Sequence, residues 1–138
     1  MKLFRTVIAV ISLLFSATSI AECLIEGQEL SFTGRISQEI FPGPPNYESI
    51  ENGDSLETYW IFTISTPQCI KAESDIEGEL YKAITRFQLA FKDNEIYTSQ
   101  KSLVGNTVSV KGELFLAVSG HHHTEALILV KDLMLVIH

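Results

Sequence analysis

Three consecutive histidines, His121, His122 and His123, are the residues of this sequence with the clearest chemical potential. Gly120 and Thr124 frame them, and apolar runs lie on both sides. They are three of the four histidines in the chain, and imidazoles titrate near neutral pH. The pattern predicts the exposed tip of a β-hairpin, and we therefore expect a functional surface there.

These histidines have three possible uses. In an extended stretch His121 and His123 point to the same side, so they can bind zinc, copper or nickel if a third ligand is added. The candidate third ligands are three carboxylates: Glu125, Asp54 and Glu57. The second use is a hydrogen-bonding or pH-sensitive contact with a partner. The third is structural, with the imidazoles packed on Tyr47 or Phe41. Because clustered titratable groups mark sites only statistically, we rank structure first, partner second and metal third.

A second unusual segment runs from Phe41 to Tyr47 and contains Pro42, Pro44 and Pro45. Proline restricts the backbone and favours extended geometry, so we expect a stiff loop with an aromatic residue at each end. Such a loop is either the wall of a binding cleft or a rigid cover over one end of the fold. An acidic series follows, as a helical turn or a solvated loop: Glu48, Glu51, Asp54 and Glu57.

Alternating apolar and polar residues predict five β-strands, at 30–40, 57–65, 83–92, 107–118 and 126–137. A short helix capped by Asn94 and closed by Gly105 is expected between the third and fourth strands. This order is that of a five-stranded oligonucleotide/oligosaccharide-binding (OB) barrel, and Gly34 and Gly112 suit its bends. The predicted fold class is all-β with one short helix, an OB-like barrel, with a small β-sandwich as the alternative.

An OB-like barrel frames its ligand surface with the loop between strands one and two and the loop between strands four and five. In this chain those are the Pro-rich segment and the histidine tip, so we predict that they meet in one recognition face. Trp60 is expected in the core. The predicted binding residues are Phe41, Pro44, Pro45, Asn46, Tyr47, Asp54, Glu57, His121, His122, His123 and Thr124.

The first residues have the pattern of a secretory signal peptide. Lys2 and Arg5 precede an apolar run that is too short to span a membrane. Small residues follow this run and form a cleavage-site pattern that ends at Ala21. Cleavage there leaves residues 22–138 as a single domain with no stable membrane anchor. Cys23 and Cys69 then predict a disulfide, since paired cysteines are typical of exported proteins. We expect a periplasmic or secreted protein.

Charge and motifs restrict the class of function. Without Lys2 and Arg5, eight basic residues remain against 17 acidic ones, a formal charge of −9. Such a surface repels phosphate backbones, so we expect no nucleic-acid partner, whereas a basic protein is compatible.

The sequence contains no nucleophile elbow, phosphate loop or fixed pair of catalytic carboxylates. We therefore expect that the protein is not an enzyme and has no cofactor, with a divalent metal such as zinc as the alternative.

Four segments together resemble a known family: FPGPPNYE at 41–48, GDxxE at 53–57, WIFTISTPQC at 60–69 and GELFLAVSGHHHTEALILV at 112–130. The chain resembles an uncharacterised bacterial family of exported proteins, the domain of unknown function 4431. The resemblance implies that both loops are signature features, and it supplies no activity or substrate. It favours a small ligand- or protein-binding accessory module.

We therefore expect a binding module that recognises an unknown small ligand or protein through residues 41–57 and 119–125. One alternative is an inhibitor or immunity protein that neutralises a secreted toxin or hydrolase, with negative charge steering it toward a basic enzyme. The other alternative is a metal-binding protein that holds its ion with His121 and His123.

Overall fold

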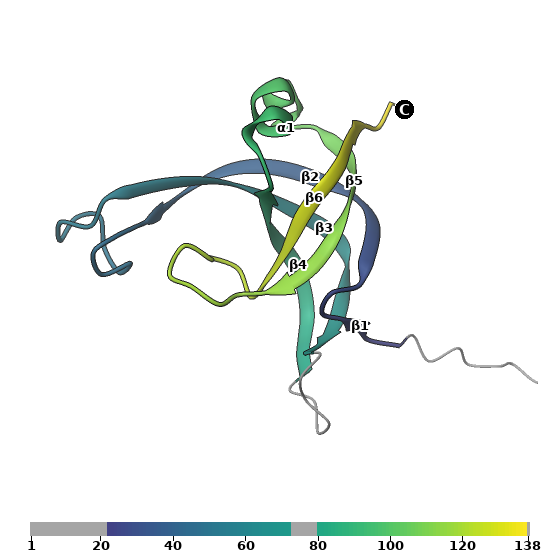
Figure 1. The fold of residues 1–138 in the computed structure, drawn as a ribbon, viewed down its shortest axis with the longest axis horizontal. Helices are drawn as coiled ribbons and strands as arrows, with labels where there is room; N and C mark the ends of the chain where they lie inside the picture. Colours follow the sequence, from purple (N-terminus) through teal and green to yellow (C-terminus); the bar gives the residue numbers. More distant parts are fainter. Residues whose placement is uncertain (1–21, 73–79, 138) are drawn as a thin grey trace, which may run out of the picture.

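The computed structural model describes residues 22–72 and 80–137, which form an all-β fold with one short helix (Figure 1). The predicted signal peptide and its cleavage site lie outside the described residues. The strands are β1 (Leu24–Ile25), β2 (Glu29–Pro42), β3 (Leu56–Lys71), β4 (Leu80–Phe91), β5 (Thr107–Leu116) and β6 (Ala126–Leu135). Helix α1 (Asn94–Ser99) and the 3-10 helix η1 (Lys101–Leu103) lie between β4 and β5.

Five of the strands close into a barrel. β2 pairs antiparallel with β3 and with β5, β3 pairs antiparallel with β4, and β5 pairs antiparallel with β6. The parallel pair β4–β6 completes the ring, with a helix between the third and fourth of its strands. This closed, mixed barrel confirms the OB-like fold, and the sandwich alternative is wrong because the pairing is continuous around the ring.

The core lies inside the barrel, where apolar side chains alternate along the strands. Trp60 is 2% exposed, so its expected place in the core is confirmed. The other large side chains of this core include Ile36, Phe62, Phe87, Val108 and Leu114. Burial of this apolar surface is the main contribution to the stability of the fold.

Two glycines allow strands to approach closely, as the sequence predicts. A Cβ added at Gly34 would lie 2.3 Å from the carbonyl oxygen of Thr63. A Cβ added at Gly112 would lie 2.3 Å from the carbonyl oxygen of Leu129. Any side chain at either position would therefore force the barrel apart, which explains why these strands carry glycine.

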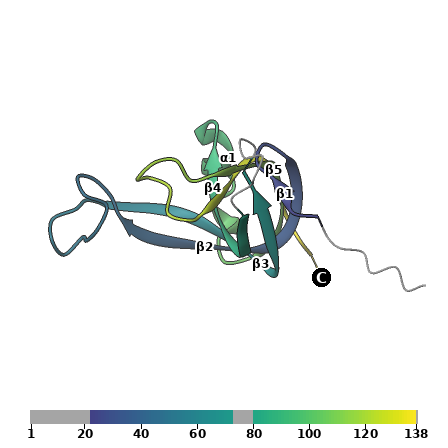
Figure 2. The ribbon, with the colours of Figure 1, turned by 90° about the horizontal axis from the view of Figure 1, so that it is seen from below.

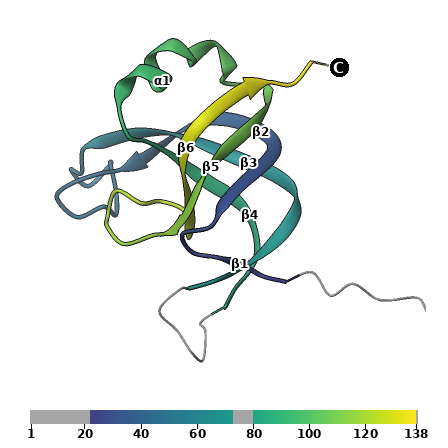
Figure 3. The same ribbon diagram turned by 45° about the vertical axis from the view of Figure 1, so that its right-hand side comes forward.

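β2 and β3 are longer than predicted and extend beyond the barrel as a hairpin arm (Figures 1 and 2). Their pairing runs from Arg35 opposite Thr63 to Pro42 opposite Leu56, so the strand includes the first proline. The arm carries the Pro-rich segment at its end. In Figures 1 and 3 this end lies on the same side of the barrel as the loop between β5 and β6.

The predicted disulfide is present between Cys23 and Cys69, with Cα atoms 4.6 Å apart. Cys69 lies inside β3, whereas the sequence suggested a position after that strand. The bond holds β1, which was not predicted, alongside β3, with Leu24 opposite Ile70. Among the described residues, no helix has both the length and the apolar character needed to cross a membrane.

The helix differs from the prediction at its start. Asp93, in an extended conformation, is the N-cap, and its carboxylate accepts the backbone N–H of Glu95. Asn94, the predicted cap, is the first helical residue. The α-helix ends at Ser99 and η1 follows it. Gly105, at φ 89°, then allows the turn into β5.

Candidate functional site

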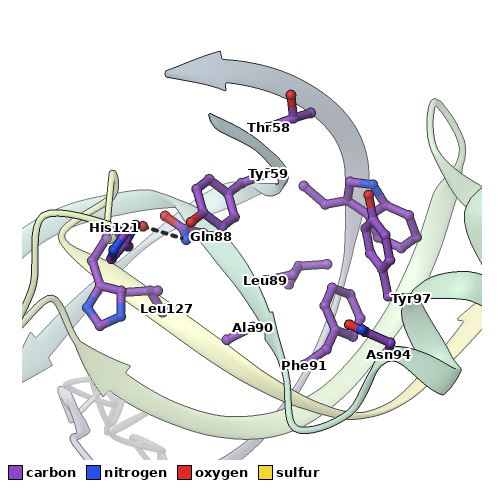
Figure 4. A pocket seen from close by; sticks show the side chains of 12 residues that line it. Thr58, Tyr59, Gln88, Leu89, Ala90, Phe91, Asn94, Tyr97, His121 and Leu127 are labelled. Carbon is purple, nitrogen blue, oxygen red and sulfur yellow. Dashed lines mark hydrogen bonds between the residues drawn. The ribbon is translucent and has the colours of Figure 1, made fainter. Parts of the chain in front are cut away.

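The loop between β5 and β6 (residues 117–125, the β5–β6 loop) folds back onto the outer face of the barrel. Gln88 of β4 holds it there. The Gln88 Oε1 accepts the His123 N–H at 2.8 Å, and the Gln88 Nε2 donates to the His121 carbonyl at 3.0 Å (Figure 4). The Gln88 N–H donates to the Thr124 hydroxyl, which in turn donates to the carbonyl of Ala126. Thr124, a predicted binding residue, thus positions the loop.

This loop covers a small apolar layer outside the barrel core. Ile61 is paired in register with Gln88, and Gln88 with Leu127, so the three form one row on the outer face. Ile61 and Leu127 are fully buried, and Gln88 is 3% exposed. The sequence pattern placed Gln88 on the outer face correctly. It gave no signal that another segment would cover that face.

Glu57 connects the histidines to the arm. Its Oε1 lies 2.5 Å from His121 Nδ1, and its Oε2 lies 3.2 Å from His123 Nε2. The His121 Nε2 also contacts the Tyr47 hydroxyl at 3.1 Å. The His123 ring stacks on Phe41, with ring centres 4.4 Å apart. The predicted meeting of the Pro-rich segment with the histidine tip is therefore present, and Glu57 is at its centre.

Close packing accompanies these polar contacts. A Cβ added at Gly120 would lie 2.9 Å from ring atoms of Tyr47, so the two segments touch directly at this glycine. The ring of His122 points to the other side and contacts Phe115, with centres 5.5 Å apart. The alternation of the three histidines that we expect from extended geometry thus assigns His121 and His123 to the arm, and His122 to β5.

The electrostatics of this cluster favour an ionised Glu57. Burial raises the pKa of Glu57, but hydrogen bonds from His123, His121 and Tyr59 outweigh it and leave the pKa below its usual value. Burial and the charge of Glu57 raise the pKa of Tyr59. Burial, with the charges of the adjacent histidines, lowers the pKa of His122. At neutral pH the cluster contains one carboxylate held by imidazole and phenol groups.

Asp54 organises the Pro-rich loop from inside. It is 6% exposed, and its carboxylate accepts the backbone N–H groups of Asn46, Glu48 and Ser49 at 2.8–2.9 Å. The hydrogen bonds from Ser49 and Glu48 are the main reason that the pKa of Asp54 is lowered. The loop consists of turns, so the acidic helical turn considered above does not form. Pro44, Pro45 and Asn46 are exposed at the end of the arm.

The metal alternative gains no support from this arrangement. Within residues 22–72 and 80–137, no three His, Cys, Asp or Glu side chains are placed to hold a metal ion together. Of the proposed third ligands, Glu57 is the one whose carboxylate contacts both His121 and His123. Asp54 faces backbone amides, and Glu125 is exposed.

A cleft of about 350 Å³ opens beside this cluster, between β3, β4, α1 and the β5–β6 loop (Figure 4). Tyr59, Gln88 and His121 lie at one end of it, and Phe91 and Tyr97 lie at the other. Among the predicted binding residues, His121 and His122 line the cleft. Its lining contains no aspartate, glutamate, lysine or arginine.

An aromatic group forms the apolar part of the cleft. The ring of Trp60 lies 4.8 Å from that of Tyr97 and 5.4 Å from that of Phe91, between ring centres. The indole nitrogen of Trp60 is buried and has no hydrogen-bond partner among the described residues. A buried donor without an acceptor is rare in native structures and calls for an explanation. The sequence places Trp60 in the core and gives no sign of this unpaired donor.

Part of the chain matches a known protein family. Residues 86–133 match the family described as "Domain of unknown function (DUF4431)", whose span here runs from β4 through the β5–β6 loop into β6. No curated protein matches the chain. The match includes Gln88 and the three histidines but not the arm. The expected resemblance is therefore confirmed for this part of the chain: residues 86–133 match an uncharacterised family, the domain of unknown function DUF4431.

Proposed function

We propose that this protein is a periplasmic or secreted binding module, not an enzyme, and that its ligand occupies the cleft between β3, β4, α1 and the β5–β6 loop. The observation that carries the proposal is the cleft itself. It combines an aromatic, largely apolar lining with a few polar groups at its ends, which is typical of ligand sites in proteins. The Cys23–Cys69 disulfide supports the oxidising compartment.

The Pro-rich segment and the β5–β6 loop support the site, because contacts between them hold the wall of the cleft in place. Glu57 bonds to His121 and His123, and Gln88 bonds to the loop backbone between them. These contacts favour the structural use of His121 and His123 over direct coordination of a metal. His121 retains an exposed side chain (52%) at the edge of the cleft, so it has both roles in the proposal.

The lining also indicates the chemistry of the ligand. Burial of a charge without a partner is costly, and no side chain of opposite charge lines the cleft. The portion of the ligand that enters is therefore uncharged. It has an apolar part for Phe91 and Tyr97 and a polar part for Tyr59 and His121 at the other end of the cleft. A phosphate backbone does not meet these requirements, consistent with the expected absence of a nucleic-acid partner.

The chain contains one tryptophan, Trp60, so its fluorescence reports on the cleft. We would titrate the protein with uncharged probes, namely N-acetylglucosamine oligomers and N-acetyl amino-acid amides, and follow Trp60 emission and backbone amide chemical shifts. A single-stranded DNA oligonucleotide serves as the charged comparison. We expect at least one uncharged probe, and not the oligonucleotide, to shift the signals of Ala90 and Tyr97.

A matched pair of variants tests where the probe binds. Ala90→Leu places a larger side chain in the cleft and should weaken probe binding at least tenfold. Ser31→Leu adds a leucine at an exposed position of β2, opposite Lys111 of β5, and should leave binding unchanged. If no uncharged probe perturbs the cleft, or if both variants bind equally well, the proposed function is wrong.

A further inference from the structure

The cleft lies where two neighbouring strands of the barrel stop pairing with each other. β3 and β4 pair at Ile61 opposite Gln88 and continue from there through Thr63 opposite Arg86. In the other direction β3 continues back to Leu56 and β4 continues to Phe91, but the structure gives no further β3–β4 pair among these described residues. We call this unpaired stretch the seam.

Along the seam, each of the two strands remains paired with a different neighbouring strand on its other side. β3 remains paired with β2 as far as Leu56 opposite Pro42. β4 remains paired with β6 as far as Phe91 opposite Val130. The residues that line the cleft from these strands include 58–60 and 89–91, the same residues that lack the β3–β4 pairing. The cleft is therefore bounded by two strand edges that face each other.

The β5–β6 loop is attached to β4 at the closed end of the seam. The N–H of Gln88 donates to the Thr124 hydroxyl, and the side chain of Gln88 bonds to His121 and His123. The β5–β6 loop therefore contacts β4 at the last residue that pairs with β3. Beyond this residue, the strands separate around the cleft.

A strand edge is a specific kind of binding surface. Alternate residues of an edge strand direct N–H and C=O groups outward, and another extended chain can pair with them. Recognition by addition of a strand uses these main-chain hydrogen bonds for affinity and side-chain pockets for specificity. We propose that the cleft receives an extended, uncharged polypeptide segment of a partner protein, which pairs as an added strand with β3 at residues 56–60. This inference rests on the proposed function and specifies its ligand class.

The side chains around the seam set the pattern of the segment. In an added strand, alternate side chains point toward the barrel interior, where Trp60, Phe91 and Tyr97 form the aromatic group. An apolar side chain suits this position. The remaining side chains of the added segment point to the other face, toward Tyr59 and His121. Polar residues suit those positions.

The inner face of the arm extends the same surface. Ile40, opposite Thr58, is 60% exposed, and Leu56, opposite Pro42, is 56% exposed. By alternation from Ile36 and Trp60, Ile40 and Leu56 are on the inner face of the hairpin, but they lie beyond the barrel core. An apolar side chain two residues along the added strand would cover them. The expected segment is therefore uncharged, with apolar and polar residues alternating.

The experiment uses peptides of defined backbone chemistry. We would select from random ten-residue peptides displayed on phage, with the full-length exported protein as target, and synthesise the best binder. Two derivatives would carry N-methyl groups on alternate backbone amides, one on the odd residues and one on the even residues. N-methylation removes backbone donors and leaves the side chains in place, so the pair is matched.

We expect the selected peptides to alternate between apolar and polar residues, and one N-methyl series to lose at least tenfold more affinity than the other. Amide hydrogen exchange of β3 residues 56–60 should slow at least tenfold in the complex. Ala90→Leu should weaken binding and Ser31→Leu should not.

Other outcomes would overturn the inference in distinguishable ways. If peptides or sugars bind in the cleft but both N-methyl series bind alike, the strand-addition inference is wrong and the proposed function stands. If neither peptides nor uncharged small probes bind, the proposed function fails as well. If light scattering shows dimers and Ala90→Leu makes them monomeric, the seam binds a second copy of the chain, which overturns the assignment to a different partner.

Discussion

At the scale of single residues, Glu57 joins the Pro-rich segment to the β5–β6 loop. It contacts His121 and His123, which are 64 and 66 positions away in the sequence. Its side chain is only 14% exposed and that of His123 is 11% exposed, so the Glu57–His123 contact is shielded from water, whereas His121 is 52% exposed. Partly buried, charge-assisted hydrogen bonds of this kind contribute more than exposed ion pairs do.

Replacement of Glu57 by glutamine keeps the size of the side chain and removes its charge. We expect Glu57→Gln to lower the free energy of unfolding by about 1–3 kcal/mol at pH 7, because hydrogen bonds to a charged group are lost. Urea unfolding measures this difference. The matched control is Glu51→Gln, which changes an exposed carboxylate of the same loop and should cost little.

The effect of Glu57 depends on pH in a defined direction. Its pKa in the folded protein lies below the usual value of 4.5 for a glutamate, so its stabilising contribution is fully present above about that pH. The contribution is lost as the pH falls through the folded pKa. The difference in unfolding free energy between the wild type and Glu57→Gln should therefore shrink as the pH falls below about 4.5. A difference that stays constant over this range would show that ionisation of Glu57 is not involved.

The two histidines bound to Glu57 should respond differently to substitution. His123 is 11% exposed and stacks on Phe41, whereas His121 is 52% exposed. We expect His123→Ala to destabilise the fold by about 1–3 kcal/mol and His121→Ala by less than about 1 kcal/mol, because the first leaves a buried partner unpaired. Thermal and urea unfolding measure both. Equal, negligible effects would contradict the structural role of His123.

The sequence predicted much of the residue-scale site. Phe41, Tyr47, Glu57, His121 and His123 were expected to meet, and they do. Gln88 could not be identified because alternation shows which face a residue occupies but not what covers that face. Asp54 was grouped with the binding residues, but the structure shows its carboxylate bonded to loop amides.

At the scale of elements, the position of the β5–β6 loop depends on one glutamine of β4. Gln88→Leu has a similar volume but cannot bond to the His121 carbonyl or the His123 N–H. We expect a loss of about 1–3 kcal/mol in unfolding free energy and faster amide exchange in residues 119–124. The control is Gln68→Leu, since Gln68 makes an exposed bond to the nearby Thr66 carbonyl. Unchanged exchange in the loop would show that Gln88 does not hold it.

The close approach of β5 and β6 depends on Gly112. Gly112→Ala would bring a Cβ to 2.3 Å from the carbonyl oxygen of Leu129, so β5 and β6 must separate. We expect destabilisation of about 1–3 kcal/mol or more, measured by urea unfolding. Ser109→Ala, on the same strand, should stay within about 0.5 kcal/mol. A mild effect of Gly112→Ala would mean that the barrel relaxes easily at this point.

The first and last residues of the helix and strands were less predictable from the sequence than the order of these elements. The helix was expected to begin with Asn94 as cap, but the adjacent Asp93 has that role. Both residue types cap helices well, so a single sequence does not separate them. The alternation of apolar and polar residues predicted that the first strand ends at residue 40, before Pro42. β2 extends to Pro42 because pairing in the arm is with β3 alone at that end.

At the scale of the whole molecule, the order of strands and the helix between the third and fourth were enough to predict the barrel. The seam was not predictable from the sequence. It depends on where β3 and β4 stop pairing, and the apolar character of both strands continues past that point. Local patterns contain no information about a missing partner across the sheet.

The Cys23–Cys69 bond stabilises the molecule as a whole. It joins residues 46 positions apart, and loop-closure estimates for such a span give about 4 kcal/mol. We expect the double variant Cys23→Ala, Cys69→Ala to lose a substantial part of this amount in urea unfolding. The wild type treated with a reducing agent should behave like the variant. If the variant is as stable as the oxidised wild type, the bond is not needed to hold β1.

The continuous ring of strands has a consequence for the way this family is delimited. The matched region, residues 86–133, supplies the second half of β4, all of β5 and most of β6, but neither β2 nor β3. If this region were produced alone, it would lack two neighbouring strands of the barrel. Its hydrophobic core would then be exposed to water. Such a fragment should aggregate instead of folding, so the matched region is smaller than the unit that can fold independently.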